Sequence, residues 1–127
     1  MLLPEDQRYL SDKEWPYRVV DSTNPHLLII ERYPLPEGYS ETAVKLLLEV
    51  PPGYPDAGLD MFWVHPTIKF SKNDQLPQAA DSMEPKCDDL SWQRFSRHGY
   101  PWKPGDSIVS YLIWIRRELE DNVRALG

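Results

Sequence analysis

Two periodicities of apolar residues, one near the middle of the chain and one at its end, constrain the fold most. From Ala43 to Val50 successive side chains alternate in a way that predicts a strand with one buried face. Near the C-terminus, apolar residues recur every three or four positions: Ile108, Leu112, Ile115, Leu119 and Val123. This spacing predicts an amphipathic helix that is capped by Asp106 or Ser107 and ends near Arg124.

Shorter patterns complete the expected order of elements. Residues 4–10 favour a short helix, because Pro4 suits a first helical position and acidic side chains follow it. Apolar or aromatic runs predict further strands over residues 17–20, 26–33 and 59–64, bounded by turn residues or proline. Strands grouped between two terminal helices predict an α+β fold, in which a short N-terminal helix and a long C-terminal helix pack on an antiparallel four-stranded sheet.

The segment that follows these strands has a much weaker pattern. Residues 67–91 show little apolar periodicity, and residues 92–98 are compatible with a short helical turn. We therefore expect a long irregular segment over about 67–101, and segments of this length in a compact domain are usually functional or mobile. A length of 127 residues predicts a single domain over 1–127. The composition, 41% hydrophobic and 27% charged, is typical of a globular protein.

Charge and cysteine usage argue against several classes of protein. The net charge is −6 and the basic residues do not cluster, so we expect no nucleic-acid binding. Cys87 is the only cysteine, so no internal disulfide is possible. No stretch resembles a signal peptide or a membrane span, and we expect a cytoplasmic protein that binds no membrane. The few histidines lack the short spacings of a zinc site, and we expect neither a metal nor a cofactor.

Three proline-aromatic blocks carry a resemblance to a known fold. They are Tyr54-Pro55, His65-Pro66 and Trp102-Lys103-Pro104, and they occur in the order found in the ubiquitin-conjugating (UBC) fold. The blocks PLPEGY, GYPDAGLDMFW, WQRFSRH and GDSIVSYL resemble more narrowly a bacterial branch of that superfamily. The resemblance covers roughly residues 40–120. It implies a UBC-like domain that works with a ubiquitin-like protein and an ATP-using, adenylating activating enzyme.

The same resemblance implies structural roles for the blocks. Tyr54 is expected to pack its ring under the sheet while Pro55 fixes the turn. Trp102 and Pro104 are expected to anchor the returning chain before the last helix. A conjugating enzyme also needs a nucleophile that accepts the C-terminal acyl group of the modifier and passes it to an amine or another acceptor.

Two residues compete for the role of nucleophile. Cys87 has the chemistry of the typical family, but it precedes Trp102 by 15 positions, about twice the spacing of the family's cysteine. Ser96 precedes Trp102 by 6 positions, and it lies in WQRFSRH, a block of the bacterial branch that is thought to use an oxyester route. The resemblance therefore favours an oxyester at Ser96, with a thioester at Cys87 as the alternative.

Two residues that follow Ser96 in the sequence are candidates for assisting its catalysis. His98 is a candidate general base, and the two side chains share a face only if the segment is a strand. Arg97 is a candidate for stabilising the developing oxyanion. Thr67 stands where the family has the asparagine of its His-Pro-Asn motif. This departure leaves open a non-catalytic variant that only binds its partners, and a weaker third hypothesis is an unrelated enzyme that uses Cys87 with His98.

Overall fold

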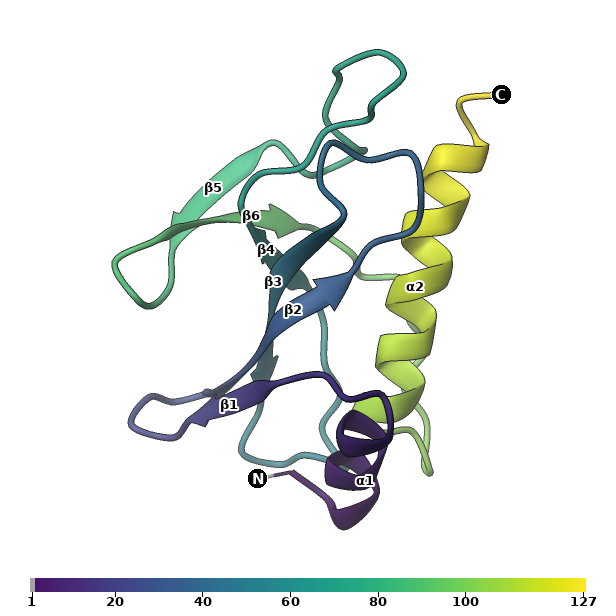
Figure 1. Cartoon of the computed structure of the whole chain (residues 1–127). Coiled ribbons are helices and arrows are strands. Elements are labelled where there is room, and N and C mark those ends of the chain that lie inside the picture. The colour runs from purple at the N-terminus through teal and green to yellow at the C-terminus, as the bar shows by residue number, and fades with distance from the viewer. Residues whose placement is uncertain (1) are drawn as a thin grey trace.

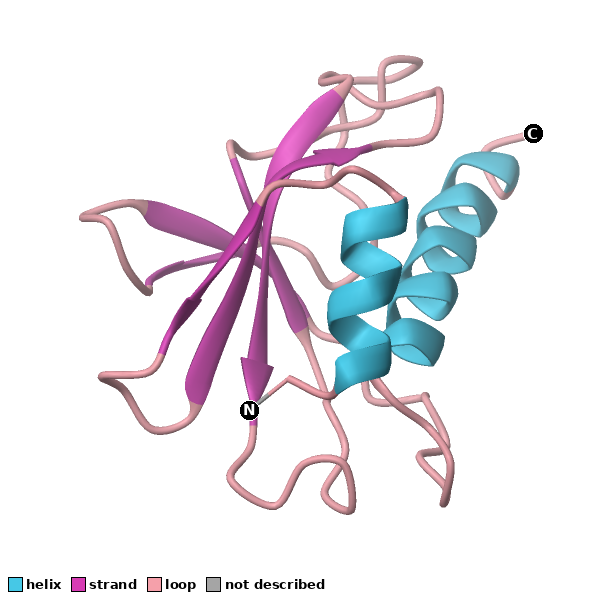
Figure 2. Ribbon diagram, turned by 60° about the horizontal axis from the view of Figure 1, so that its bottom comes forward, coloured by secondary structure: helices cyan, strands magenta, loops and turns pink. Residues whose placement is uncertain are grey.

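The computed structural model describes residues 2–127, which form two helices and one antiparallel sheet of six strands (Figure 1). The elements in chain order are α1 (Pro4–Asp12), β1 (Tyr17–Val20), β2 (His26–Pro34), β3 (Ala43–Val50), β4 (Phe62–His65), β5 (Ser82–Pro85), β6 (Ser91–Phe95) and α2 (Ile108–Arg124). The strand order across the sheet is β1-β2-β3-β4-β6-β5. Both helices lie on one side of the sheet, where α1 runs beside α2 (Figure 2).

The locally patterned elements lie where the sequence predicts them. The predicted bounds of β1 and β3 are confirmed, and β2 extends one residue beyond the prediction. Helix α2 begins after Ser107, whose hydroxyl accepts a hydrogen bond from the Val109 backbone N–H at 3.2 Å. The predicted strand over 59–64 is shifted, because the ladder between β3 and β4 begins only at the pair Leu47 and Trp63 and runs to Lys45 and His65.

The prediction of four strands and of a helical turn over 92–98 is wrong. Residues 82–95 form the β5–β6 hairpin inside the segment predicted to be irregular, and β6 pairs with β4. The rings of Phe62 and Phe95, which are partners in this ladder, stack with their centroids 4.7 Å apart. The buried side chain of Gln93 bonds to both backbone groups of Ile68 and to the Ala80 carbonyl, at 2.8–3.2 Å. These long-range pairings stabilise a strand whose local sequence shows no clear alternation.

The sheet carries a hydrophobic core on each face. The larger core lies between the sheet and the helices, where the stripe of α2 meets side chains such as Leu28, Leu46 and Leu48. The smaller core lies on the outer face and comprises Leu27, Ile29, Leu47, Trp63 and Trp92. Strand β2 is therefore apolar on both faces, whereas β3 contributes only Leu47 to the outer core, between Lys45 and Glu49, as its alternating sequence predicts.

Charged side chains cover the outer core. Arg18 of β1 forms an ion pair with Asp88 in the β5–β6 turn, although β1 and β5 are the two edges of the sheet. Lys86 of the same turn lies 2.8 Å from Glu49 and 4.1 Å above the Trp63 ring. The sheet is therefore curled enough for one edge to contact the far hairpin. Within residues 2–127, none of the helices has the length and apolar character needed to cross a membrane.

Candidate functional site

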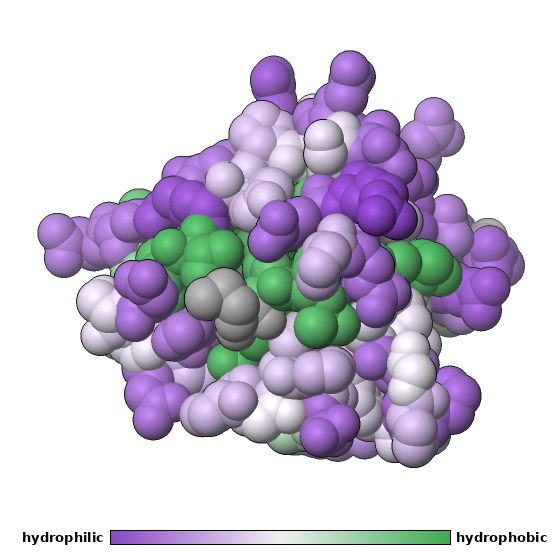
Figure 3. Space-filling view, turned by 90° about the horizontal axis from the view of Figure 1, so that it is seen from below, coloured by the Kyte–Doolittle hydropathy of each residue, from purple (hydrophilic) through white to green (hydrophobic). Residues whose placement is uncertain are grey.

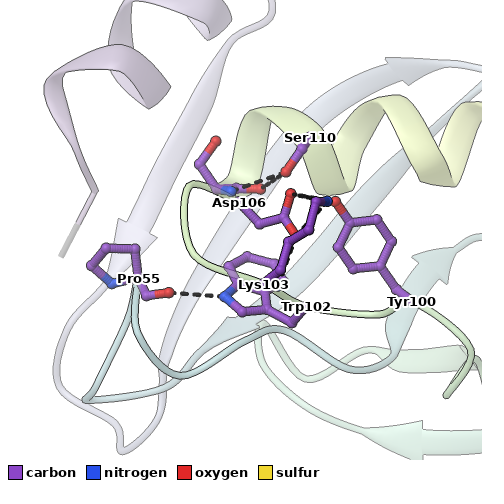
Figure 4. Close-up of polar contacts among 7 residues, drawn as sticks. Pro55, Tyr100, Trp102, Lys103, Asp106 and Ser110 are labelled. Carbon is purple, nitrogen blue, oxygen red and sulfur yellow. Dashed lines mark hydrogen bonds and ion pairs between the residues drawn. The ribbon is translucent and has the colours of Figure 1, made fainter.

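The Tyr54 and Trp102 blocks meet in one corner, beside the start of α2. The Tyr54 hydroxyl donates a hydrogen bond to Asp6 Oδ2 at 2.7 Å and accepts one from the Ile108 backbone N–H at 2.8 Å. The Trp102 indole N–H donates to the Pro55 carbonyl at 2.9 Å (Figure 4). These contacts confirm that Trp102 anchors the chain where it returns to α2.

The corner also fixes the carboxylate of Asp106. It accepts hydrogen bonds of 2.9 Å from the Tyr100 hydroxyl and from the Lys103 backbone N–H (Figure 4). Burial disfavours the charged form, but these hydrogen bonds outweigh it and lower the pKa of Asp106. A cavity of about 380 Å³ adjoins the corner and is lined by Leu3, Pro55 and Trp102 among others.

Seen from below, the molecule shows a patch of hydrophobic side chains bordered by hydrophilic ones (Figure 3).

Ser96 lies immediately after β6, half-buried beside a guanidinium group. Its Oγ accepts a hydrogen bond from Arg94 Nε at 3.1 Å, and its backbone N–H donates to the Ala79 carbonyl at 3.0 Å. Arg94 is held in turn by Glu84, whose Oε2 lies 2.8 Å from Arg94 Nη1. The structure thus gives Ser96 a positively charged donor that the sequence analysis did not single out.

His98 has a different partner from Ser96. Its Nδ1 lies 2.9 Å from Asp60 Oδ1, and both side chains are largely exposed. The strand ends at Phe95, so Ser96 and His98 do not belong to one regular strand face. Asp60 is a further candidate that sequence reasoning missed, because the only signal was an acidic residue just before an aromatic strand, 38 positions away.

Arg97 is the most buried of the three neighbouring site residues. Its Nε lies 3.1 Å from Glu118 of α2, and its Nη1 donates to the Gln78 carbonyl at 2.8 Å. The guanidinium also lies 5.5 Å from the centre of the Phe95 ring. In this arrangement Arg97 connects the end of β6 to α2 and to the preceding loop, and its charge is paired.

Cys87 lies at the other end of β6, in the β5–β6 turn. Five strand residues separate the turn from Ser96, so the near end of the turn lies roughly 15 Å from Ser96 along the strand, and Cys87 lies further back in the turn. The thiol packs against the outer core. Burial raises the pKa of Cys87, and the neighbouring Asp88 carboxylate raises it further, while Arg18 acts in the opposite sense.

The His65-Pro66-Thr67 block borders the hairpin rather than Ser96. His65 Nδ1 lies 3.0 Å from the Ser91 carbonyl oxygen, and its ring centroid is 5.9 Å from that of Trp92. The Thr67 hydroxyl lies 3.5 Å from the Met83 sulfur. In the part of the chain that the structure describes, no three His, Cys, Asp or Glu side chains are grouped to hold a metal ion.

Comparison with known proteins gives one result that covers nearly the whole chain. The family model described as Prokaryotic E2 family E matches residues 2–122, a span that includes the three blocks, both candidate nucleophiles and most of α2. No curated protein and no solved structure matches the chain.

Proposed function

The chain belongs to the prokaryotic E2 family E, and we propose that it accepts the C-terminal acyl group of a ubiquitin-like protein as an oxyester on Ser96. The family suggests a conjugating-enzyme-like role, in which an activating enzyme supplies the acyl group. One observation carries the choice of nucleophile: Arg94 Nε donates a hydrogen bond to Ser96 Oγ at 3.1 Å. By contrast, burial and a neighbouring carboxylate raise the pKa of the Cys87 thiol.

Arg94 and His98 supply what a serine nucleophile lacks. A serine hydroxyl is weakly nucleophilic near neutral pH, so it needs a base to take its proton and a donor to stabilise charge on its oxygen. Arg94 is that donor. Asp60 binds Nδ1 of His98, which leaves Nε2 free to act as the base. His98 is exposed beyond the end of β6, and the proposal requires its imidazole to turn toward Ser96 when the modifier's C-terminus is bound.

The proposed reaction has two acyl transfers. In the first, Ser96 gives its proton to His98 and attacks the carbonyl carbon of a thioester on the activating enzyme, so that a C–O bond forms, the C–S bond breaks and the thiolate leaves. In the second, an amine attacks the same carbon, a C–N bond forms and the C–O bond breaks. His98 returns its proton to the Ser96 oxygen, and the amine nitrogen releases one proton to solvent. No group is oxidised or reduced, and the activating enzyme alone consumes ATP.

Adduct chemistry tests this function. The chain is incubated with its activating enzyme, ATP and the ubiquitin-like protein, and the adduct is treated with a reducing agent or with hydroxylamine. We expect an adduct that resists reduction, is cleaved by hydroxylamine, disappears in Ser96→Ala and persists in Cys87→Ser. An adduct that is lost in Cys87→Ser and cleaved by the reducing agent would instead establish the thioester alternative.

A second candidate function is a binding variant without acyl transfer. It is favoured by the separate partners of Ser96 and His98 and by the ion pair that occupies Arg97. This alternative predicts a stable complex with the activating enzyme or the modifier in size-exclusion chromatography, with no covalent adduct in denaturing gels. Acyl transfer through Ser96 would exclude it.

A further inference from the structure

A groove of about 520 Å³ lies between α1, the end of β2 and the outer side of α2. We call it the α1–α2 groove and define it by Tyr9, Lys13, Trp15, Tyr33, Ile113 and Arg117, all of which line it. Figure 2 shows the two helices side by side, with the sheet to their left. The groove is separate from Ser96, because neither Ser96 nor its hydrogen-bond partners Arg94 and Ala79 line it.

The floor of the α1–α2 groove is preformed and aromatic. Trp15 packs edge-on against Tyr33, with ring centroids 5.2 Å apart, and against Tyr9 at 6.1 Å. Tyr33 is buried, with 1% of its surface exposed, so this part of the floor is fixed. Ile113 forms an apolar wall and is 43% exposed. Fixed aromatic surfaces of this kind bind an apolar side chain with little loss of conformational entropy.

The rim of the groove is positively charged, although the whole chain carries a net charge of −6. Arg116 is paired with Glu120 at 3.2 Å, and this carboxylate is the groove's one acidic side chain within the described residues. Neither Lys13 nor Arg117 forms an ion pair with any residue between 2 and 127. Lys13 Nζ instead lies 5.5 Å from the centre of the Tyr9 ring. The groove therefore presents two unpaired cations beside an apolar floor.

We infer that the α1–α2 groove binds an acidic peptide segment of a partner protein. A bulky apolar side chain of the segment packs between Trp15, which Tyr33 supports from beneath, and Ile113. Carboxylates on either side of it pair with Lys13 and Arg117. The charge of the rim selects this occupant, because a basic or neutral segment leaves both cations unpaired. The inference is independent of the acyl transfer at Ser96, since none of the groove residues contacts that site.

Selection from a random peptide display library on the immobilised chain tests the inference. We expect enriched peptides to combine several Asp or Glu residues with a Leu, Phe or Trp. Their affinity is expected to fall at least tenfold in the Lys13→Glu/Arg117→Glu variant and also in Ile113→Ser. The matched control is Arg8→Glu/Arg32→Glu, which changes the net charge equally at two exposed positions outside the groove and is expected to retain binding. Thermal unfolding by circular dichroism checks that each variant is folded.

Three outcomes would overturn the inference. The first is a selection that yields no peptide whose binding the groove variant weakens. The second is an equal loss of binding in the control variant, which would show a general charge effect. The third is a concentration-dependent dimer, measured by light scattering, that Ile113→Ser dissociates, because the occupant would then be a second copy of the chain.

Discussion

The two ends of β6 place two candidate nucleophiles in opposite electrostatic surroundings. At one end, Cys87 is half-buried beside Asp88, and both burial and that carboxylate raise the pKa of the thiol. At the other end, Ser96 receives a hydrogen bond from a guanidinium N–H. The intrinsically better nucleophile thus has the environment that weakens it, and the weaker one has a donor that helps it. Residue type alone therefore does not decide between the two candidate nucleophiles.

Removal of the Ser96 hydroxyl should produce the largest effect. We expect Ser96→Ala to reduce adduct formation at least about a hundredfold, since the variant lacks the hydroxyl that accepts the Arg94 Nε–H hydrogen bond and would carry the acyl group. The measurement is single-turnover transfer of the modifier, followed on denaturing gels. Ser91→Ala, at the opposite end of β6, is the matched control and should retain full transfer. Equal loss in both variants would mean that the hairpin, and not the Ser96 hydroxyl, is required.

Removal of the Arg94 donor should have the next largest effect. We expect Arg94→Gln to slow the transfer roughly tenfold, less than the loss of a donor in an enclosed oxyanion site because Ser96 is half-exposed. Glu84→Gln is the control: it cancels the charge that holds Arg94 but keeps Oε1 as the acceptor for the Trp63 indole N–H, at 2.8 Å. Glu84→Gln should slow the transfer clearly less than Arg94→Gln does. A wild-type rate in Arg94→Gln would remove the observation on which the choice of Ser96 depends.

Alkylation of Cys87 tests the other end of the strand, with a smaller expected effect. Only the thiolate reacts with iodoacetamide, and a raised pKa leaves less thiolate at any given pH. The alkylation rate of Cys87 should therefore increase with pH only at higher pH values than the alkylation rate of a cysteine in an unstructured peptide. Asp88→Asn removes one contribution that raises the pKa and frees Arg18 to act on the thiol, so alkylation at pH 8 should accelerate about threefold. An unchanged or slower rate would contradict this electrostatic description.

The contrast between local and long-range information explains what the sequence could predict. The bounds of β1 and β3 follow from spacing within a few residues and were predicted, and the α2 cap was narrowed to Asp106 or Ser107, of which the structure shows Ser107. β6 was not predicted, because its partner β4 lies about thirty residues earlier and Gln93 acts by satisfying distant backbone groups. Likewise, the pair of Asp60 and His98 exists only in the folded chain. The position of Trp102 came from resemblance, since no periodicity indicates it.

Substitutions in the turn between β5 and β6 should have the smallest effect. They also offer a second way to tell whether the acyl group is carried by Cys87 or by Ser96. Asp88 and Asp89 both have positive φ, at 59° and 54°, and the Leu90 N–H donates to the Cys87 carbonyl at 3.1 Å. Glycine adopts this backbone without a Cβ clash, so Asp89→Gly should raise the free energy of unfolding by about 0.5 kcal/mol. Asp89→Ala, the matched control, should lower it by about 1 kcal/mol in urea denaturation. If Asp89→Ala is at least as stable as Asp89→Gly, strain at this position is not what limits the turn.

Because this turn positions Cys87 and lies far from Ser96, both variants should leave the adduct yield unchanged if the acyl group is on Ser96. A yield that follows the stability of the turn would place the acyl group on Cys87 instead.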